Sequence, residues 1–194
     1  MMIKIAITGA PCSGKTEFIR WVNNSSSDFI VLPEIASITK STGLKFKTEI
    51  ERTQFQKVVF GLQKDFEKQI ADVTICEEQI VTLCDRGTVD AVAYCQDSFI
   101  RENNIDVIYE AASYDMVIFF KLPENERVYD ELCKENIYRD EDYVTSKHLE
   151  QRLLSLWGYH KNLVTIPFMK NAVEKYELAH DALLEFLEKH RRLY

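Results

Sequence analysis

Short apolar runs alternate along the chain with longer stretches in which apolar residues recur every three or four positions. The short runs are rich in β-branched residues and predict buried strands, whereas the periodic stretches predict amphipathic helices. The predicted strands cover residues 3–8, 28–33, 80–84, 116–122 and 163–167. The predicted helices cover residues 15–23, 54–72, 88–101, 144–157 and 169–190.

This order of elements predicts the fold class. Strands that are apolar throughout and separated by amphipathic helices are typical of a parallel sheet that is covered on both faces. We therefore expect an α/β fold of three layers, with a parallel five-stranded sheet and helices on both of its faces. The sequence contains no internal repeat and no long linker, so residues 1–194 are expected to form a single domain.

Two helices carry the apolar stripes that are expected to face the core. The stripe of the helix over 54–72 comprises Phe55, Val59, Leu62, Phe66 and Ile70, and that of the last helix comprises Val173, Tyr176, His180, Leu183 and Leu187. Residues 23–27 are expected to form a loop. The polar segment 38–53 is interpreted as a flexible segment over a site, or as a short helix followed by a loop.

The charge balance narrows the range of partners. The chain has 24 basic and 31 acidic residues, which gives a net charge of −7. An acidic protein repels phosphate on average, so we expect neither nucleic acid nor an anionic membrane surface as a partner. No apolar run approaches the roughly 18 residues of a membrane span. These features predict a cytoplasmic protein.

The number and spacing of the cysteines also agree with a cytoplasmic protein. The five cysteines form no C-x-x-C pair, and the four histidines do not lie at zinc-ligand spacing from them. This pattern argues against a disulfide framework or a zinc site and favours a reducing compartment.

One motif carries the main chemical signal. Residues 9–16 match G-x-x-x-x-G-K-[ST] at every position, between a predicted strand and a predicted helix. The expected nucleotide-binding residues are Gly9, Ala10, Pro11, Cys12, Ser13, Gly14, Lys15 and Thr16. In such a loop the backbone N–H groups surround a phosphate, the lysine contacts the β- and γ-phosphates, and the Thr16 hydroxyl binds Mg²⁺. The alternative is a glycine-containing turn that binds nothing, but motif, strand and helix agree.

The motif predicts a P-loop NTPase sandwich that uses a nucleoside triphosphate and Mg²⁺. The sequence has no guanine-reading N/TKxD motif, which favours ATP. Cys12 is interpreted as a variable position of the loop, with redox sensitivity beside the helix dipole as the alternative.

Charged residues follow two further strands. Glu34 follows the second strand, and Asp85 and Arg86 follow the third. Because the carboxyl ends of parallel strands share one edge, these side chains are expected beside the phosphate loop. Asp85 is a candidate metal ligand or base, Glu34 the other candidate base, and Arg86 a candidate clamp for phosphate or substrate. The structural alternatives are a surface ion pair for Asp85 and Arg86, and a helix-start carboxylate for Glu34.

Weaker candidates are Gln63, Arg127 and Arg139, which do not lie at the ends of predicted strands. Gln63 lies close to the apolar stripe of its helix, where its amide either reads the edge of a nucleobase or an amide, or bonds to backbone or water. The charged segment 124–142 contains Arg127 and Arg139. It is interpreted as a lid whose arginines cover the phosphates, or as a solvated surface helix.

The blocks GAPCSGKT, LPEIAS, FQKVVFGLQKDFE and DRGTVDAVAYC resemble the NadR-type AAA domain family, which includes the ribosylnicotinamide kinase part of NadR. The resemblance covers approximately residues 3–190 and is more distant to thymidylate and deoxynucleoside kinases. It implies a substrate or metal role for Glu34 and Asp85, a phosphate or substrate role for Arg86, and an acceptor-facing Gln63. Ser37 departs from the family pattern, which commonly has an arginine there.

These observations together predict an ATP- and Mg²⁺-dependent kinase that phosphorylates a hydroxyl of a nucleoside- or nucleotide-like small molecule. The alternative is a nucleotide-binding regulatory protein or weak NTPase that acts through a partner. The oligomeric state stays open, with a homodimer as one alternative.

Overall fold

The computed structural model describes residues 2–25, 28–44, 46–74, 80–133 and 141–191. Five parallel strands form one sheet in the order β2-β3-β1-β4-β5. The strands are β1 (Met2–Thr8), β2 (Phe29–Leu32), β3 (Ile80–Asp85), β4 (Met116–Phe120) and β5 (Leu163–Ile166). The sequence pattern predicts each of them to within two residues at either end, which confirms the α/β fold with an all-parallel five-stranded sheet.

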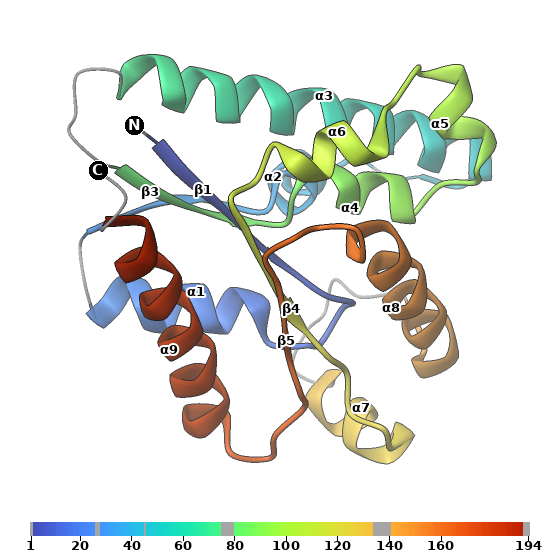
Figure 1. The fold of residues 1–194 in the computed structure, drawn as a ribbon. Coiled ribbons are helices and arrows are strands. Elements are labelled where there is room, and N and C mark those ends of the chain that lie inside the picture. Colours follow the sequence, from blue (N-terminus) through green and yellow to red (C-terminus); the bar gives the residue numbers. More distant parts are fainter. Residues whose placement is uncertain (1, 26–27, 45, 75–79, 134–140, 192–194) are drawn as a thin grey trace.

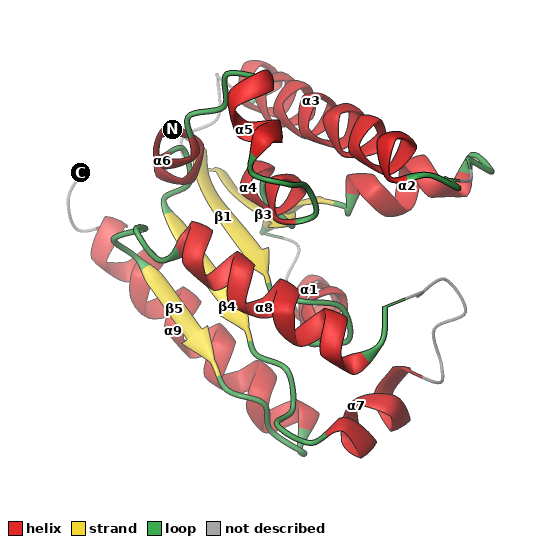
Figure 2. Cartoon of the chain, turned by 90° about the vertical axis from the view of Figure 1, so that its right-hand side faces the viewer, coloured by secondary structure: helices red, strands yellow, loops and turns green. Residues whose placement is uncertain are grey.

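Helices cover both faces of the sheet (Figure 1). They are α1 (Lys15–Ser25), α2 (Ile35–Ser41), α3 (Glu49–Val73), α4 (Thr88–Ala93), α5 (Ser98–Glu102), α6 (Val107–Ala112), α7 (Glu126–Cys133), α8 (Tyr143–Trp157) and α9 (Ala172–Arg191). α1 and α9 lie on one face, and α3, α4, α6 and α8 lie on the other. Figure 2 shows α7 outside these layers, beyond the end of β4.

The two core clusters follow the alternation of side chains along β1. Ile5 and Ile7 face α1 and α9 and pack with Phe18 and Leu183. Ala6 points to the opposite face, where the residues of α4 and α8 form a second cluster around Trp157. Successive residues of a strand point to opposite faces, so one apolar strand supplies both cores.

Several helix boundaries differ from the sequence prediction. α3 begins at Glu49 because Thr48 and Glu51 form a capping box, in which each side chain accepts from the other residue's backbone N–H. The predicted helix over 88–101 is wrong as one element: α4 and α5 are separate, and α6 follows with Asp106 as its N-cap. Residues 23–25 belong to α1, not to a loop. Apolar periodicity does not report such caps and breaks.

The predicted buried face of α3 is partly wrong. Leu62 and Phe66 are exposed, whereas Gln63 and Glu67 are buried. Glu67 accepts hydrogen bonds from Lys4 and from the Tyr114 hydroxyl, so its burial is compensated by polar partners. A hydrophobic pattern cannot identify a face that buries a polar network.

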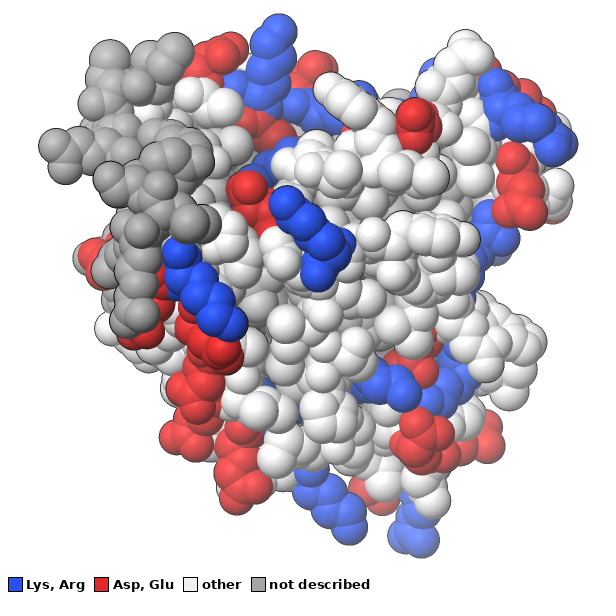
Figure 3. Space-filling view, in the orientation of Figure 1, with Lys and Arg blue, Asp and Glu red and all other residues white. Residues whose placement is uncertain are grey.

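The surface carries mixed charge. On the face seen in Figure 3, the described basic and acidic side chains are interspersed rather than gathered into one basic patch. Among the described residues, every helix is too short or too polar to cross a lipid bilayer.

Candidate active site at the phosphate loop

The phosphate loop connects β1 to α1 and bends back on itself at its two glycines. Gly9 has φ +140°, and a Cβ there would overlap the carbonyl oxygen of Phe120. Gly14 has φ +93°, and a Cβ there would lie 2.7 Å from Nζ of Lys175. Gly9 therefore requires glycine for both conformation and space, and Gly14 requires it for conformation.

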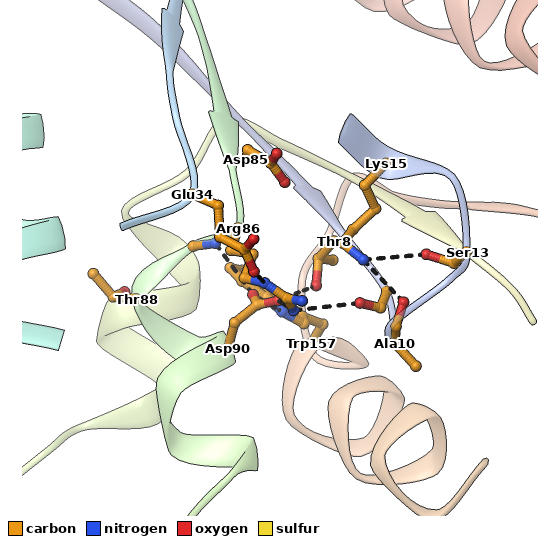
Figure 4. A network of polar contacts seen from close by, with 12 residues as sticks. Thr8, Ala10, Ser13, Lys15, Glu34, Asp85, Arg86, Thr88, Asp90 and Trp157 are labelled. Atoms are coloured by element: carbon orange, nitrogen blue, oxygen red, sulfur yellow. Dashed lines mark hydrogen bonds and ion pairs between the residues drawn. The ribbon is translucent and has the colours of Figure 1, made fainter. Parts of the chain in front are cut away.

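Lys15 is folded into the curve of this loop (Figure 4). Its side chain is buried, and Nζ donates to the Ala10 carbonyl at 2.9 Å and to Ser13 Oγ at 3.3 Å. The ammonium group is thus held at the concave side of the loop, where positive charge stabilises phosphate oxygens.

A second lysine, from α9, donates a hydrogen bond to the backbone of the loop. Lys175 of α9 is buried, and its Nζ donates to the Ser13 carbonyl at 3.3 Å. Burial lowers the pKa of Lys175. The sequence does not single out this residue, because a lysine between the predicted stripe residues Val173 and Tyr176 carries no apolar signal. Val173 itself is exposed, which corrects that part of the predicted stripe.

Thr16 and Asp85 meet where β1 and β3 end side by side. The strand register pairs Ile7 with Asp85, and Thr16 Oγ1 donates to Asp85 Oδ2 at 2.8 Å. Asp85 is buried, and among the described residues its Oδ1 has no hydrogen-bond partner. Burial, and then the charge of Glu34, raise the pKa of Asp85, against the opposing effect of Lys15 and Arg86.

These two side chains fit a magnesium site. Mg²⁺ is a hard cation that binds oxygen ligands and is commonly held in nucleotide-binding loops by a hydroxyl and a carboxylate. The buried Asp85 Oδ1 accepts no hydrogen bond from the described residues, and a cation or its bound water would supply a partner.

Arg86 connects this region to Glu34. Its backbone has φ +81°, which is uncommon for a residue with a side chain. Its Nε forms an ion pair with Glu34, and its Nη1 lies 3.5 Å from the Gly9 carbonyl oxygen. The structure therefore brings Glu34, Asp85 and Arg86 to the same strand edge as the loop, as the sequence predicts.

Glu34 is held in its ionised form. Burial acts to raise the pKa of Glu34, but the Arg86 charge and a hydrogen bond from the Ser37 hydroxyl outweigh it. The pKa falls from an ordinary 4.5 to about 2. The Ser37 hydroxyl thus supports the carboxylate of Glu34 directly.

This shift predicts a pH dependence of stability. A carboxylate with a depressed pKa stabilises the fold above pH 4.5, and this contribution is lost as the pH falls from 4.5 towards 2. We expect the difference in Tm between the wild type and Glu34→Gln to narrow over that range in thermal denaturation. Glu177→Gln, an exposed position of α9, controls for the loss of one charge. A difference that does not change with pH would contradict the assignment.

Asp90 is a buried acidic residue that the sequence pattern does not single out. It accepts hydrogen bonds from Thr8 Oγ1 at 2.6 Å and from Trp157 Nε1 at 3.1 Å, and it lies 3.5 Å from Arg86 Nη1. Asp90 therefore positions Arg86 from the side opposite Glu34 (Figure 4). In the sequence, the one indication of this contact is that Asp90 follows Arg86 by four residues, near the start of a predicted helix.

Gln63 contacts the backbone of Arg86. Its amide nitrogen donates to the Arg86 carbonyl at 3.2 Å and to Glu67 at 2.8 Å. These bonds support the unusual backbone of Arg86. Contact between Gln63 and an acceptor molecule stays a prediction.

The structure describes only one of the two arginines of the predicted lid, Arg127, and does not bring it to the site. The Arg127 side chain is 88% exposed on α7 and pairs with Glu131 of the same helix. Arg139 lies outside the described residues.

The cysteine prediction needs a correction, because Cys12 and Cys133 form a disulfide. They are 121 residues apart in the sequence, and their Cα atoms lie 6.0 Å apart. The fold brings together two cysteines whose spacing in sequence has no pattern, and spacing alone therefore argued wrongly against a disulfide.

Two cavities lie away from the residues of the candidate site. One, of about 260 Å³, is lined by residues of α3 and α5 with Asn103, and the other, of about 220 Å³, is lined by residues of α6 with Tyr114 and the segment 159–161. Glu34 and Asp85 line neither of them.

Comparison with known proteins shows the family of the chain and supports its fold. A search of functionally curated proteins gave no significant match. The fold is similar to that of deoxyadenosine kinase from M. mycoides, solved with dCMP and a flexible dCDP bound, at a TM-score of 0.67 and 12% identity over 94% of this chain and all of that one. A family model described as an AAA domain matches residues 4–175, which include the phosphate loop, Glu34 and Arg86. The chain therefore belongs to this family of AAA domains.

Proposed function

We propose that the protein is an ATP- and Mg²⁺-dependent kinase that transfers a phosphoryl group to a hydroxyl of a nucleoside- or nucleotide-like acceptor. The observation that carries the proposal is the position of Arg86. It is paired with Glu34 on one side and lies against the Gly9 carbonyl on the other. A second polar site, suited to a hydroxyl and a phosphate, thus adjoins the phosphate loop.

The donor nucleotide is expected to bind along the loop. The N–H groups of residues 9–16 and the N-terminus of α1 surround the phosphates. Lys15 exchanges its bonds to Ala10 and Ser13 for phosphate oxygens. When bound by Thr16 and Asp85, Mg²⁺ would offset the negative charge of the transferring phosphoryl group.

The acceptor hydroxyl is assigned to Glu34 and Arg86. A carboxylate with a pKa of about 2 is a weak base at neutral pH, so Glu34 orients the hydroxyl by accepting its hydrogen bond rather than by removing its proton beforehand. Phosphoryl transfer through a loose transition state depends mainly on positioning and charge, which this pair supplies. Arg86, fixed by Asp90, is placed to stabilise charge on the phosphoryl oxygens.

The fold similarity to a deoxyadenosine kinase supports a nucleoside-type acceptor. The test is a thermal-shift panel of nucleosides, nucleotides and vitamin ribosides in the presence of a non-hydrolysable ATP analogue and Mg²⁺. Stabilisation rises with ligand concentration over Kd, so a true acceptor raises Tm further than the analogue alone. An analogue that fails to raise Tm would refute the proposal.

One observation favours a second candidate, a nucleotide-dependent regulator or weak NTPase. Arg127, the described arginine of the predicted lid, is exposed and pairs with Glu131 instead of reaching the phosphate loop, whereas a kinase commonly closes such an arginine over the phosphates. A regulator would hydrolyse ATP without an acceptor and would transfer no phosphate to a small molecule.

A further inference from the structure

The disulfide joins the phosphate loop to α7. Cys12 lies in the loop between Pro11 and Ser13, and Cys133 is the last residue of α7. The Cα separation of 6.0 Å lies within the usual range for a disulfide. A covalent bond therefore connects the proposed phosphate site to an element outside the three layers.

Cys12 lies at the part of the loop that is expected to contact phosphate. Its backbone is left-handed, with φ +63°. The next residue, Ser13, bonds to Lys15 through its hydroxyl, and its own N–H lies 3.4 Å from the Ala10 carbonyl oxygen. A constraint on Cys12 is therefore transmitted to the backbone that holds the lysine.

The rest of α7 is attached without the disulfide. Tyr129 is buried in a small cluster with Ala10 and Leu122, and its hydroxyl lies 2.6 Å from Ser146 Oγ of α8. Residues 131 and 132, next to Cys133, are exposed. The middle of α7 is thus anchored by packing, whereas its last turn depends more on the covalent bond.

The four cysteines among the described residues differ in how accessible their sulfur atoms are. Cys12 and Cys133 are partly exposed, whereas Cys84 and Cys95 are buried thiols. Thiol–disulfide exchange requires access to a sulfur atom. Among the described cysteines, the pair at the loop is therefore the one that an external dithiol or disulfide would reach first.

We propose that Cys12 and Cys133 form a reversible redox modification site that controls nucleotide exchange at the phosphate loop. This inference rests on the proposed function of the loop. The oxidised pair fixes the last turn of α7 beside the loop, and reduction frees both. Because nucleotide release requires the elements around the phosphates to separate, release is slower in the oxidised protein.

The chemistry is a two-electron exchange. One thiolate of an external dithiol attacks a sulfur of the Cys12–Cys133 bond, which breaks and leaves a mixed disulfide. The second thiol of the dithiol then displaces the remaining protein sulfur. The protein gains two thiols, and the dithiol becomes a disulfide. Oxidation is the reverse reaction with a low-molecular-weight disulfide, which is reduced to two thiols.

The test compares oxidised and reduced protein in two measurements. Alkylation before and after dithiothreitol, followed by peptide mass mapping, reports whether Cys12 and Cys133 are bonded to each other. Stopped-flow release of a fluorescent ATP analogue, chased with unlabelled ATP, reports the dissociation rate. Cys133→Ser is the test variant, and Cys95→Ala, which changes a cysteine away from the loop, is the matched control.

We expect release at least about tenfold slower from the oxidised wild type than from the reduced protein. Cys133→Ser should release nucleotide at the reduced rate under both conditions, and Cys95→Ala should behave as the wild type. Equal rates in both redox states, or no mapped Cys12–Cys133 bond after oxidation, would overturn this inference and leave the kinase proposal intact. A reduced protein that binds no nucleotide would instead overturn the proposed function, and with it this inference.

Discussion

Replacement of Lys15 by alanine is expected to lower phosphoryl transfer by about 10³-fold or more and to weaken ATP binding markedly. The Lys15 ammonium is buried in the concave side of the loop and bonds to the Ala10 carbonyl and to Ser13 Oγ. In the nucleotide complex it would neutralise charge on the β- and γ-phosphates, and alanine supplies no donor there. Transfer loses more than binding because the negative charge on the leaving phosphate grows in the transition state.

The effect is measured by calorimetric titration with ATP and by steady-state kinetics of transfer. Lys68→Ala removes the same charge from an exposed position of α3 and should leave both values near the wild type. Because Lys15 also bonds within the loop, the Tm of Lys15→Ala is compared with that of the wild type, so that unfolding is separated from lost binding. Unchanged ATP affinity and transfer in a folded Lys15→Ala variant would remove the phosphate-loop assignment.

Asp85→Asn is expected to lower transfer by about 10²-fold or more, with little loss of stability. The amide keeps the shape of the side chain and an oxygen that accepts from Thr16, but it lacks the charge that holds a divalent cation. Burial raises the pKa of Asp85, so its ionised form is disfavoured in the fold, and asparagine removes that cost. Lower activity in a protein of equal or higher Tm is therefore the expected combination.

The Mg²⁺ concentration needed for half-maximal transfer distinguishes a metal-binding role of Asp85 from a purely structural one. If the carboxylate holds the metal, Asp85→Asn should require a higher Mg²⁺ concentration for half-maximal transfer. Asp72→Asn, an exposed position of α3, is the control for charge. Transfer near the wild-type rate with an unchanged Mg²⁺ requirement would make Asp85 a structural residue that supports Thr16.

The strands and the phosphate loop could be predicted from the sequence because their signals are local. Each strand is a short apolar run, and the loop is a motif of fixed spacing in which Gly9 and Gly14 are required by backbone conformation. The parallel order then placed Glu34, Asp85 and Arg86 at one edge. This step needs only the rule that parallel strands end on the same side of the sheet.

The residues that were missed depend on contacts between distant parts of the chain. Lys175 supports the loop from α9, and Asp90 holds Arg86 only because Thr8 and Trp157 converge on it. Glu67 is buried because Lys4 and Tyr114 pair with it, and this reverses the predicted inner face of α3. A polar residue gains such a partner from the tertiary fold, so hydrophobic periodicity cannot report it.

The disulfide could not be predicted for the same reason, because it joins distant parts of the chain. Cys12 was weighed as a variable loop residue or a redox-sensitive thiol, but its partner lies 121 residues away at the end of α7. The charged segment around α7 gave no apolar pattern from which its packing against the loop could be derived. In the structure, Tyr129 is the buried residue of α7 that packs beside Ala10.

Product analysis of the reaction with γ-labelled ATP tests the kinase account most directly. The reduced protein is incubated with labelled ATP and Mg²⁺, with and without the acceptor that gives the largest thermal shift. We predict that the label appears on that acceptor in a one-to-one ratio with ADP, and that little ATP is consumed without it. Label released as inorganic phosphate at the same rate with and without acceptor would contradict the account and identify an NTPase instead.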